Sequence, residues 1–373
     1  MKKNKLKLAI MSEKAGLKKE ILAQEAVIIY GGGTVARDVI SVLEKKGINV
    51  RCIIDAKDLK LNSINGIPIL KPDDGQFSPN QKSSTYVIVS VFNAYVHMPA
   101  IHSQLKKNGW DKVVPFLDFY DNFSEEIGNR YWLTKKDYYT DHENNIAKAY
   151  SLLADEKSKD LFTKIVNFRL TGDYELLDKP EEGTQYFPND IPSWNENLRI
   201  IDCGAYDGDT LRQIQTRGIN LKAYAGFEPD PSNFLKLANA IRSSNCNASY
   251  TIWPCGVWSH TCQLNFSSGN GSGSNINQSG DIVIQCTSLD ESLPTFQPNL
   301  IKMDIEGAEY SALLGSVKTI HKYRPGMAIC LYHEPSHLWR IPFLIRSWGL
   351  DYEFYLRCHC FNGFDLVLYA IPA

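Results

Sequence analysis

The stretch LRIIDCGAYDGDT, residues Leu198–Thr210, decides the fold of the C-terminal half of the chain. Its opening residues, Leu198 to Ile201, are apolar and predict a buried strand. Asp202 to Gly208 then form a glycine-containing turn, and Thr210 begins a helix. This order of strand, turn and helix predicts the first unit of an open sheet whose ligand lies at the turn.

Five predicted strands alternate with helices in this half, which indicates an α/β fold with a parallel sheet. The later four lie in KAYAGFEPDP, ASYTIWPCGVW, NLIKMDIEGAE and GMAICLYHEP. The chain closes with DYEFYLRCHC, a glycine turn at Gly363, and FDLVLYAIP. Spacing and composition predict that these last two segments form a β-hairpin, so an antiparallel pair ends the sheet.

The first half of the chain contains a second pattern of this kind. An apolar strand at Ala26–Tyr30 leads into a glycine turn, and Asp55 follows the next strand. The turn fits G-x-G-x-x-A, the pattern of a Rossmann-like nucleotide-binding unit, in which the acid holds a ribose hydroxyl. Gly31, Gly33 and Asp55 are therefore predicted to form a second ligand site. The alternative is that the glycines only allow helix and strand to pack closely.

The pattern along the chain predicts four segments. Residues between Arg130 and Leu177 have helical spacing of apolar residues. The proline-rich stretch that follows, LLDKPEEGTQYFPNDIPSW, predicts a connector and a domain boundary. Ser267–Gly280 is rich in glycine and serine and predicts a mobile loop, either a solvated hairpin end or a lid. The segments are a basic tail and helix at 1–24, a Rossmann-like nucleotide-binding domain at 25–122, a helical connector at 123–190, and a second domain at 191–373.

The composition is typical of a soluble globular protein. The 373 residues are 43% hydrophobic and 22% charged, with a net charge of −2, which gives no indication of nucleic-acid binding. No apolar run is long enough for membrane insertion, and the basic N-terminus lacks the apolar core of a signal peptide. The odd number of cysteines, nine, favours reduced thiols and a cytoplasmic location.

The turn after Leu198–Ile201 favours S-adenosylmethionine over a dinucleotide. Its acids would repel a pyrophosphate and attract the α-amino group and sulfonium of S-adenosylmethionine, which has no phosphate. Glu228 follows the next strand, where a carboxylate can accept two hydrogen bonds from ribose hydroxyls. The exit of the third strand is expected beside the adenine. The predicted cofactor-binding residues are Asp202, Gly204, Ala205, Tyr206, Gly208, Thr210, Glu228, Pro229, Cys255 and Gly256.

A possible zinc-protease motif occurs at His333, Glu334 and His337, which fit H-E-x-x-H. That motif requires a helix, but Pro335 lies between the histidines and disfavours one. His333 also comes directly after a predicted strand. We therefore predict no zinc site here, and we place His337 on the surface at the start of a helix.

Three stretches, Asp202–Thr210, FEPDP at Phe227–Pro231 and IKMDIEGAE at Ile301–Glu309, resemble the FkbM-type methyltransferases. LADEKSK, AICLYHEPSHLWRIP and YLRCHCFNGFDLVLYAIP extend the resemblance over roughly residues 145 to 373. It implies a seven-stranded methyltransferase sheet that transfers a methyl group from S-adenosylmethionine to an oxygen, commonly a hydroxyl of a sugar, glycan precursor or natural product. Members often accompany enzymes of polysaccharide or antibiotic biosynthesis.

The first half is similar, more loosely, to the N-terminal domain of bacterial sugar O-acyltransferases, which holds a nucleotide-linked sugar. The sequence keeps the glycine turn, but GGGTVARD replaces the basic, histidine-rich version. The expected partner is thus a small-molecule or glycan acceptor, either free or nucleotide-linked, and a homo-oligomer is a further expectation. Two other functions remain open: a nucleotide-sugar dehydrogenase or epimerase, and a nucleotide-binding scaffold with an inactive methyltransferase domain.

Methyl transfer to a hydroxyl requires removal of its proton. The tips of the fourth and fifth strands carry Asp304, Glu306, Glu309 and His333, although Glu309 can also be an acid favoured by the first turn of its helix. His333 is predicted to be the general base because histidine titrates near neutral pH, with Asp304 or Glu306 orienting it or the substrate. As an alternative, these three residues would bind one Mg²⁺ that polarises the acceptor.

Overall fold

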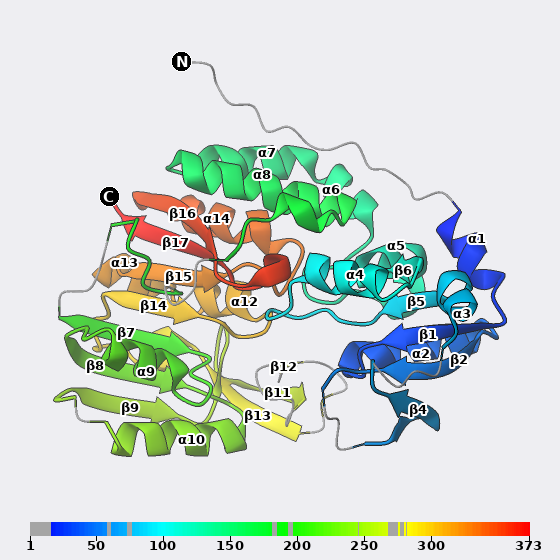
Figure 1. The fold of residues 1–373 in the computed structure, drawn as a ribbon. Helices are drawn as coiled ribbons and strands as arrows, with labels where there is room; N and C mark the ends of the chain where they lie inside the picture. Colours follow the sequence, from blue (N-terminus) through cyan, green and yellow to red (C-terminus); the bar gives the residue numbers. More distant parts are fainter. Residues whose placement is uncertain are drawn as a thin grey trace. The chain divides into compact units, whose positions relative to one another are not determined.

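The computed structural model describes residues 16–57, 61–72, 77–180, 185–192, 197–244, 246–267, 275–276, 280 and 282–373. It divides into two compact units (Figure 1). Unit 1 consists of Met1–Glu143, Thr163–Pro180 and Cys360–Phe364, and unit 2 of Asn144–Phe162, Glu181–His359 and Asp365–Ala373. The chain therefore passes between the units several times. Most of the predicted tail at 1–24 lies outside the described residues.

Unit 1 contains a six-stranded sheet in the order β3-β4-β2-β1-β5-β6, parallel except between β3 and β4. Apolar β-branched residues make β1 and β5 buried strands, and the predicted glycine turn joins β1 to α2. The strands are β1 (Ala26–Tyr30), β2 (Asn49–Ile54), β3 (Ser63–Ile64), β4 (Ile67–Leu70), β5 (Tyr86–Val89) and β6 (Lys112–Val114). The helices are α1 (Leu17–Leu22), α2 (Thr34–Lys45), α3 (Pro79–Ser84), α4 (Met98–Lys107), α5 (Phe116–Ile127) and α6 (Lys136–Asp141).

The predicted connector at 123–190 is shared between the two units. It contains the end of α5, α6, α7 (Glu143–Leu152), α8 (Glu156–Thr171) and the short 3-10 helix η1 (Tyr174–Leu176). The chain leaves the helical path between α7 and α8 although no glycine or proline is present. Within unit 2, Leu153 forms a bridge to Phe354, and the Asp155 carboxylate accepts hydrogen bonds from the Ser158 amide and from Arg357, both at 2.8 Å. The local cap from Asp155 to Ser158 and the two long-range contacts to Phe354 and Arg357 explain why α7 and α8 are separate helices.

Unit 2 contains a seven-stranded sheet in the order β16-β17-β15-β14-β7-β8-β9. β17 runs antiparallel to both of its neighbours, and the other strands are parallel, so the predicted methyltransferase sheet and its final hairpin are confirmed. The order reverses between β7 and β14, and in such sheets ligands bind at the carboxyl ends of the strands there. The strands are β7 (Leu198–Cys203), β8 (Leu221–Phe227), β9 (Ser249–Trp253), β14 (Leu300–Met303), β15 (Gly326–Cys330), β16 (Tyr352–Cys358) and β17 (Leu366–Pro372).

A second, four-stranded sheet in unit 2 was not predicted from the sequence. Its order is β10-β13-β11-β12, and it buries Phe266, Ile284 and Cys286. Most of the loop predicted at Ser267–Gly280 lies outside the described residues. The strands are β10 (Gly256–Val257), β11 (Cys262–Ser267), β12 (Asn275–Ile276) and β13 (Ile282–Thr287). The helices are α9 (Asp209–Thr216), α10 (Pro231–Arg242), α11 (Leu289–Ser292), α12 (Glu309–Leu314), α13 (Val317–Tyr323) and α14 (His337–Ser347).

Within the described residues, no helix combines the length and the apolar character that crossing a membrane requires.

Candidate active site

The turn after β7 lies directly against the end of β14. Gly204 has a φ of +79°, and a Cβ atom there would lie 2.0 Å from the backbone oxygen of Asp304. The amides of Gly204 and Ala205 both donate to the carbonyl of Phe227, at 3.0 and 2.9 Å. Only glycine fits this crossing of two chain segments. The predicted cofactor turn and the predicted acceptor residues therefore meet at the switch in strand order.

A buried ion pair between Lys302 and Asp202 stabilises the turn. Lys302 Nζ lies 3.0 Å from Asp202 Oδ1 and donates to the carbonyl of Gly204 at 2.5 Å, while the Tyr224 hydroxyl donates to Asp202 Oδ2 at 2.7 Å. Burial would lower the pKa of Lys302, but Asp202 and nearby acids outweigh it and raise that pKa, so the amine is charged. Asp202 is fully buried. Its contacts to Lys302 and Tyr224 stabilise the turn, and its carboxylate is not exposed to a ligand.

Glu228 lies at the end of β8, where it ties two backbone segments together. Its Oε2 accepts a hydrogen bond from the Tyr206 amide at 2.8 Å, and its Oε1 accepts one from the Asp230 amide at 2.9 Å. Burial raises the pKa of Glu228 to about 7 although these bonds oppose the shift. A carboxylate oxygen can accept more than one hydrogen bond. Glu228 therefore retains acceptor capacity for a diol such as that of ribose.

The remaining predicted cofactor residues surround this turn or begin the next elements. Gly208 has a φ of +87° at the start of α9, where a Cβ would lie 3.0 Å from the Ala240 Cβ. Thr210 is buried in the first turn of α9, where it serves the helix start. Cys255 and Gly256 are buried at the beginning of β10, and Pro229 follows Glu228 in the loop before α10.

The structure brings the three predicted catalytic residues together. His333 Nε2 lies 3.5 Å from Asp304 Oδ1 and 3.6 Å from Glu306 Oε2, while its Nδ1 lies 2.8 Å from Glu309 Oε1. Burial would lower the pKa of His333, but Glu309 and Glu306 outweigh it and raise the pKa to about 10. The ring is therefore an imidazolium at neutral pH. This state changes the role we assign to His333, because a protonated ring cannot accept the acceptor's proton.

Two further residues complete this cluster. Glu309, in the first turn of α12, is fully buried and holds His333 by Oε1, and its Oε2 lies 3.4 Å from His337 Nδ1. His337 is only 2% exposed, so our placement of it on the surface is wrong. It begins α14, whereas His333 lies before that helix, as expected from Pro335. The H-E-x-x-H spacing thus brings both histidines to one carboxylate without a shared helix.

Asp304 and Glu306 differ in their hydrogen bonds. Asp304 Oδ2 accepts from the Tyr186 hydroxyl at 2.7 Å, and Oδ1 accepts from the Tyr332 hydroxyl at 3.2 Å. Burial would raise the pKa of Asp304, but Lys302 and His333 lower it. Glu306 instead receives no hydrogen bond from the described residues and has a φ of +52°. Burial raises the pKa of Glu306 to about 8. Of the two acids, Glu306 thus has the strained backbone and the carboxylate that can still accept hydrogen bonds.

The predicted magnesium set does not fit this arrangement. The ligand atoms that lie within 4.8 Å of one another belong to Asp304, Glu309 and His333, so Glu309 takes the place of Glu306. Asp304 already accepts from two tyrosines, Glu309 Oε1 accepts from His333 and from the Ile305 amide at 2.9 Å, and the protonated His333 ring would repel a cation. Mg²⁺ prefers oxygens that remain open to it and to water. We derive no catalytic step through a metal.

The second predicted ligand site, in unit 1, is held together by Asp55. Its Oδ2 accepts from the Gly32 amide at 2.6 Å and its Oδ1 from the Lys57 amide at 2.7 Å. Gly31 has a φ of +101°, and a Cβ there would lie 2.6 Å from Val91 Cγ2, so packing explains this glycine. A Cβ at Gly33 would meet no heavy atom within 4 Å, which leaves that side of the turn open.

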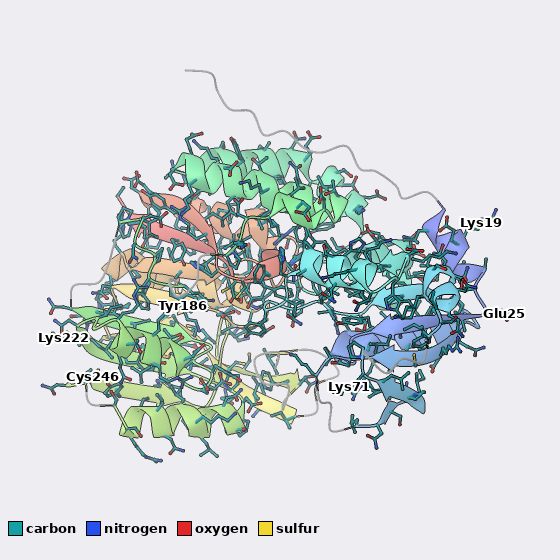
Figure 2. The ribbon with its side chains drawn as sticks, viewed as in Figure 1. Lys19, Glu25, Lys71, Tyr186, Lys222 and Cys246 are labelled. Carbon is teal, nitrogen blue, oxygen red and sulfur yellow. The ribbon has the colours of Figure 1, made fainter. Side chains whose placement is uncertain are left out.

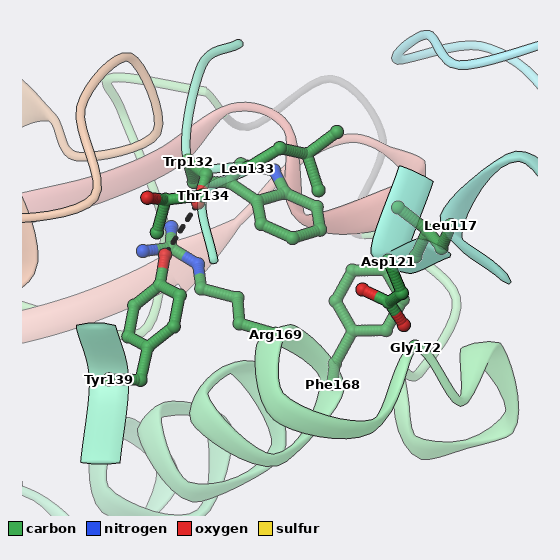
Figure 3. A pocket seen from close by; sticks show the side chains of 9 residues that line it. All are labelled: Leu117, Asp121, Trp132, Leu133, Thr134, Tyr139, Phe168, Arg169 and Gly172. Atoms are coloured by element: carbon green, nitrogen blue, oxygen red, sulfur yellow. Dashed lines mark hydrogen bonds between the residues drawn. The ribbon is translucent and has the colours of Figure 1, made fainter. Parts of the chain in front are cut away.

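Unit 1 also contains a small cavity that the sequence did not indicate (Figure 3). Its volume is about 10 Å³, room for one water molecule. Arg169 lies beside it, with its guanidinium 5.3 Å from the Trp132 ring and 5.9 Å from the Tyr139 ring. The Tyr139 hydroxyl donates to the Trp132 carbonyl at 2.6 Å. The cavity is too small for a metabolite.

Comparison with known proteins agrees with this fold. Residues 202–354 match the family model described as the methyltransferase FkbM domain. No curated protein matches the chain. The crystal structure of Methyltransferase FkbM from Methylobacillus flagellatus KT superimposes with a TM-score of 0.78 and 21% identity, covering 96% of this chain and 94% of that one.

Two more solved structures match less well. Aeropyrum pernix fibrillarin in complex with natively bound S-adenosyl-L-methionine has a TM-score of 0.31 and 13% identity, covering 48% of this chain and 67% of that one. The Pyrococcus abyssi tRNA (uracil-54, C5)-methyltransferase in complex with S-adenosyl-L-homocysteine has a TM-score of 0.25 and 15% identity. That match covers 47% of this chain and 34% of that one. These scores support no conclusion about this chain. The chain is therefore similar in fold to the Methylobacillus protein, and its residues 202–354 are similar to the FkbM methyltransferase domain.

Proposed function

We propose that the protein is an S-adenosylmethionine-dependent O-methyltransferase that acts on a hydroxyl of a sugar, a glycan precursor or a natural product. The observation that carries this proposal is the contact between Gly204 and Asp304, because it joins the predicted cofactor turn to the acidic and histidine cluster. When bound, S-adenosylmethionine supplies an activated methyl group. The match of residues 202–354 to the FkbM methyltransferase domain supports the same reaction class.

The residues around the turn fit such a cofactor. Glu228 offers carboxylate oxygens for two ribose hydroxyls, and the close crossing at Gly204 keeps bulky side chains away from the turn. Asp209 in the first turn of α9 adds negative charge beside it, which suits a cationic ligand without phosphate, whereas Arg212 pairs with Asp207 and balances its charge.

We assign the proton-accepting role to Glu306. His333 is already protonated, and both oxygens of Asp304 accept hydrogen bonds from tyrosines. Glu306 has free acceptor positions and a backbone in the left-handed region, where strain is often retained for function. The imidazolium of His333, held by Glu309, then stabilises the carboxylates on either side of it.

The test is Glu306→Gln, with Glu334→Gln as a matched control because Glu334 is exposed near the same strand tips. Formation of S-adenosylhomocysteine would be measured over a panel of sugars, nucleotide sugars and phenolic acceptors. We expect Glu306→Gln to lower kcat by about 10² to 10⁴, without changing the Kd of S-adenosylmethionine. In the wild type, kcat should rise with pH through about 8, because Glu306 must lose its proton.

Several results would contradict this assignment. Full activity in Glu306→Gln together with loss of activity in His333→Gln would return the base role to His333. A rate that disappears with a chelator would require a metal after all. Cofactor binding without transfer to any acceptor would favour the scaffold, and binding of NAD would favour a dehydrogenase or epimerase.

A second proposal concerns the nucleotide. We propose that unit 1 binds the nucleotide part of an acceptor used in cytoplasmic polysaccharide biosynthesis. The supporting features are the open side of Gly33 and the absence of an acid from the first turn of α2. Calorimetry of UDP with the full-length protein tests it, together with Asp55→Ala, which should raise the acceptor KM without changing the Kd of S-adenosylmethionine. If UDP does not bind and Asp55→Ala leaves that KM unchanged, the proposal fails.

A further inference from the structure

Tyr186 occupies an unusual position for a residue that lies outside the matched domain. It belongs to the proline-rich stretch before β7, which the sequence predicted to be a boundary, and it is labelled in Figure 2. The structure buries it within unit 2, at 4% exposure, and gives it a φ of +66°. Its amide donates to the Tyr369 hydroxyl at 3.1 Å. A bulky residue persists in this strained conformation only where its surroundings fix it.

The side chain of Tyr186 contacts both halves of the candidate site. Its hydroxyl donates to Asp304 Oδ2 at 2.7 Å, on the side of His333 and Glu306. Its ring lies 5.1 Å from Lys302 Nζ, the same ammonium group that pairs with Asp202 and binds the carbonyl of Gly204. The hydroxyl of Tyr186 thus contacts the proposed acceptor residues through Asp304, and its ring contacts the proposed cofactor turn through Lys302.

We propose that Tyr186 is a positioning residue that couples the cofactor turn to the acceptor side of the site. This inference rests on the proposed function. The hydroxyl fixes the carboxylate of Asp304, and hydrogen bonds to charged groups are the stronger ones. The ring faces a buried cation, an interaction that strengthens when both groups are shielded from water. Lys302 then keeps the turn from Asp202 to Gly204 in place.

Two substitutions separate these contacts. Tyr186→Phe removes the hydroxyl and keeps the ring beside Lys302, whereas Tyr186→Leu removes both. We expect Tyr186→Phe to lower kcat by about tenfold and to leave the Kd of S-adenosylmethionine within about twofold. Tyr186→Leu should lower kcat and also raise that Kd by about tenfold. A loss of structure alone would not produce this division between kcat and Kd.

Tyr332→Phe is the matched control, because its hydroxyl reaches the same carboxylate at the longer distance of 3.2 Å. It should lower kcat less than Tyr186→Phe and leave cofactor binding unchanged. Calorimetry with S-adenosylmethionine, initial rates, and the Tm of each variant are measured on the full-length protein. If Tyr186→Leu does not fold, the kcat of Tyr186→Phe still decides whether the hydroxyl matters.

The inference is overturned if Tyr186→Phe has the kcat of the wild type, or if the Phe and Leu variants lose cofactor affinity equally. Failure of the proposed function looks different. A wild-type protein that binds S-adenosylmethionine but methylates nothing refutes the function, while the difference in Kd between the Leu and Phe variants still tests the coupling to the turn. A wild type that does not bind S-adenosylmethionine overturns both.

Discussion

The two glycine turns of the molecule, one in each unit, are fastened in the same way. In unit 1, Asp55 accepts hydrogen bonds from the Gly32 amide in the turn and from the amide of Lys57, two residues after the acid itself. In unit 2, Glu228 accepts hydrogen bonds from the Tyr206 amide in the turn and from the amide of Asp230, two residues after the acid itself. Each acid directly follows the second strand of its unit, β2 or β8. An acid at this position therefore has a structural task whether or not a ligand binds.

What surrounds the turns distinguishes them. In unit 2 the turn crosses the end of β14 at Gly204 and rests on a buried Lys302, and Asp209 lies in the first turn of α9. In unit 1 the first turn of α2 carries no acid, and Gly33 faces open space. The shared pattern thus predicts the turn. We propose that Asp209 at the start of α9 favours a cationic ligand in unit 2, and that the lack of an acid in the first turn of α2 favours an anion in unit 1.

The largest difference is expected between Gly204→Ala and Gly33→Ala. The added methyl group at Gly204 would lie 2.0 Å from a backbone oxygen, whereas at Gly33 it meets nothing within 4 Å. We expect Gly204→Ala to abolish measurable binding of S-adenosylmethionine, and Gly33→Ala to leave that binding and the Tm unchanged. Calorimetry and thermal unfolding check this. Normal cofactor affinity in Gly204→Ala would show that the turn does not hold the cofactor.

A smaller difference is expected between Glu228→Ala and Asp55→Ala. Glu228→Ala should weaken the binding of S-adenosylmethionine by about 2–4 kcal/mol, because the proposed contact to the ribose consists of two charge-assisted hydrogen bonds. Asp55→Ala should lower the Tm, because two amides of unit 1 lose their acceptor, and should leave the Kd of S-adenosylmethionine unchanged. An equal loss of cofactor affinity in both variants would refute the division of roles between the turns.

The smallest expected effect is a pH dependence confined to the turn of unit 2. Glu228 has a pKa of about 7, and its ionised form is the better acceptor for ribose hydroxyls. The Kd of S-adenosylmethionine should therefore fall as pH rises through about 7, and Glu228→Gln should remove this dependence. By linkage, the folded state holds this proton more tightly than the unfolded state. The free energy of unfolding should thus decrease as pH rises from 4.5 toward about 7.

The strands and the glycine turns could be predicted because their signals are local. Apolar runs such as Ala26–Tyr30 have the spacing of buried strands, and a glycine that precedes a helix identifies a turn. Asp304, Glu306 and His333 could be placed together because strand ends of a parallel sheet meet at one edge. The charge state of His333 could not be foreseen, since it depends on how many carboxylates surround the ring.

The partners that the sequence did not reveal act over long sequence separations. Tyr186 binds a carboxylate 118 residues away, from a segment whose composition resembles a linker. Lys302 had one usable signal, a charged residue inside an apolar strand, which implies a buried partner such as Asp202. His337 seemed to be a surface residue because helix starts usually are exposed. Its burial against Glu309 follows from packing that no local pattern encodes.

Unit 1 is assembled from three separate stretches of the chain, and this affects when it can fold during synthesis. Its last stretch, Cys360–Phe364, lies at the end of the β16–β17 hairpin, where Phe364 packs 4.9 Å from the Phe92 ring and the Asn362 amide group donates to the Asn93 carbonyl at 2.8 Å. Synthesis proceeds from the N-terminus. Synthesis must therefore pass residue 364 before unit 1 can complete its core, and until then the Phe92 ring lacks the packing that Phe364 supplies.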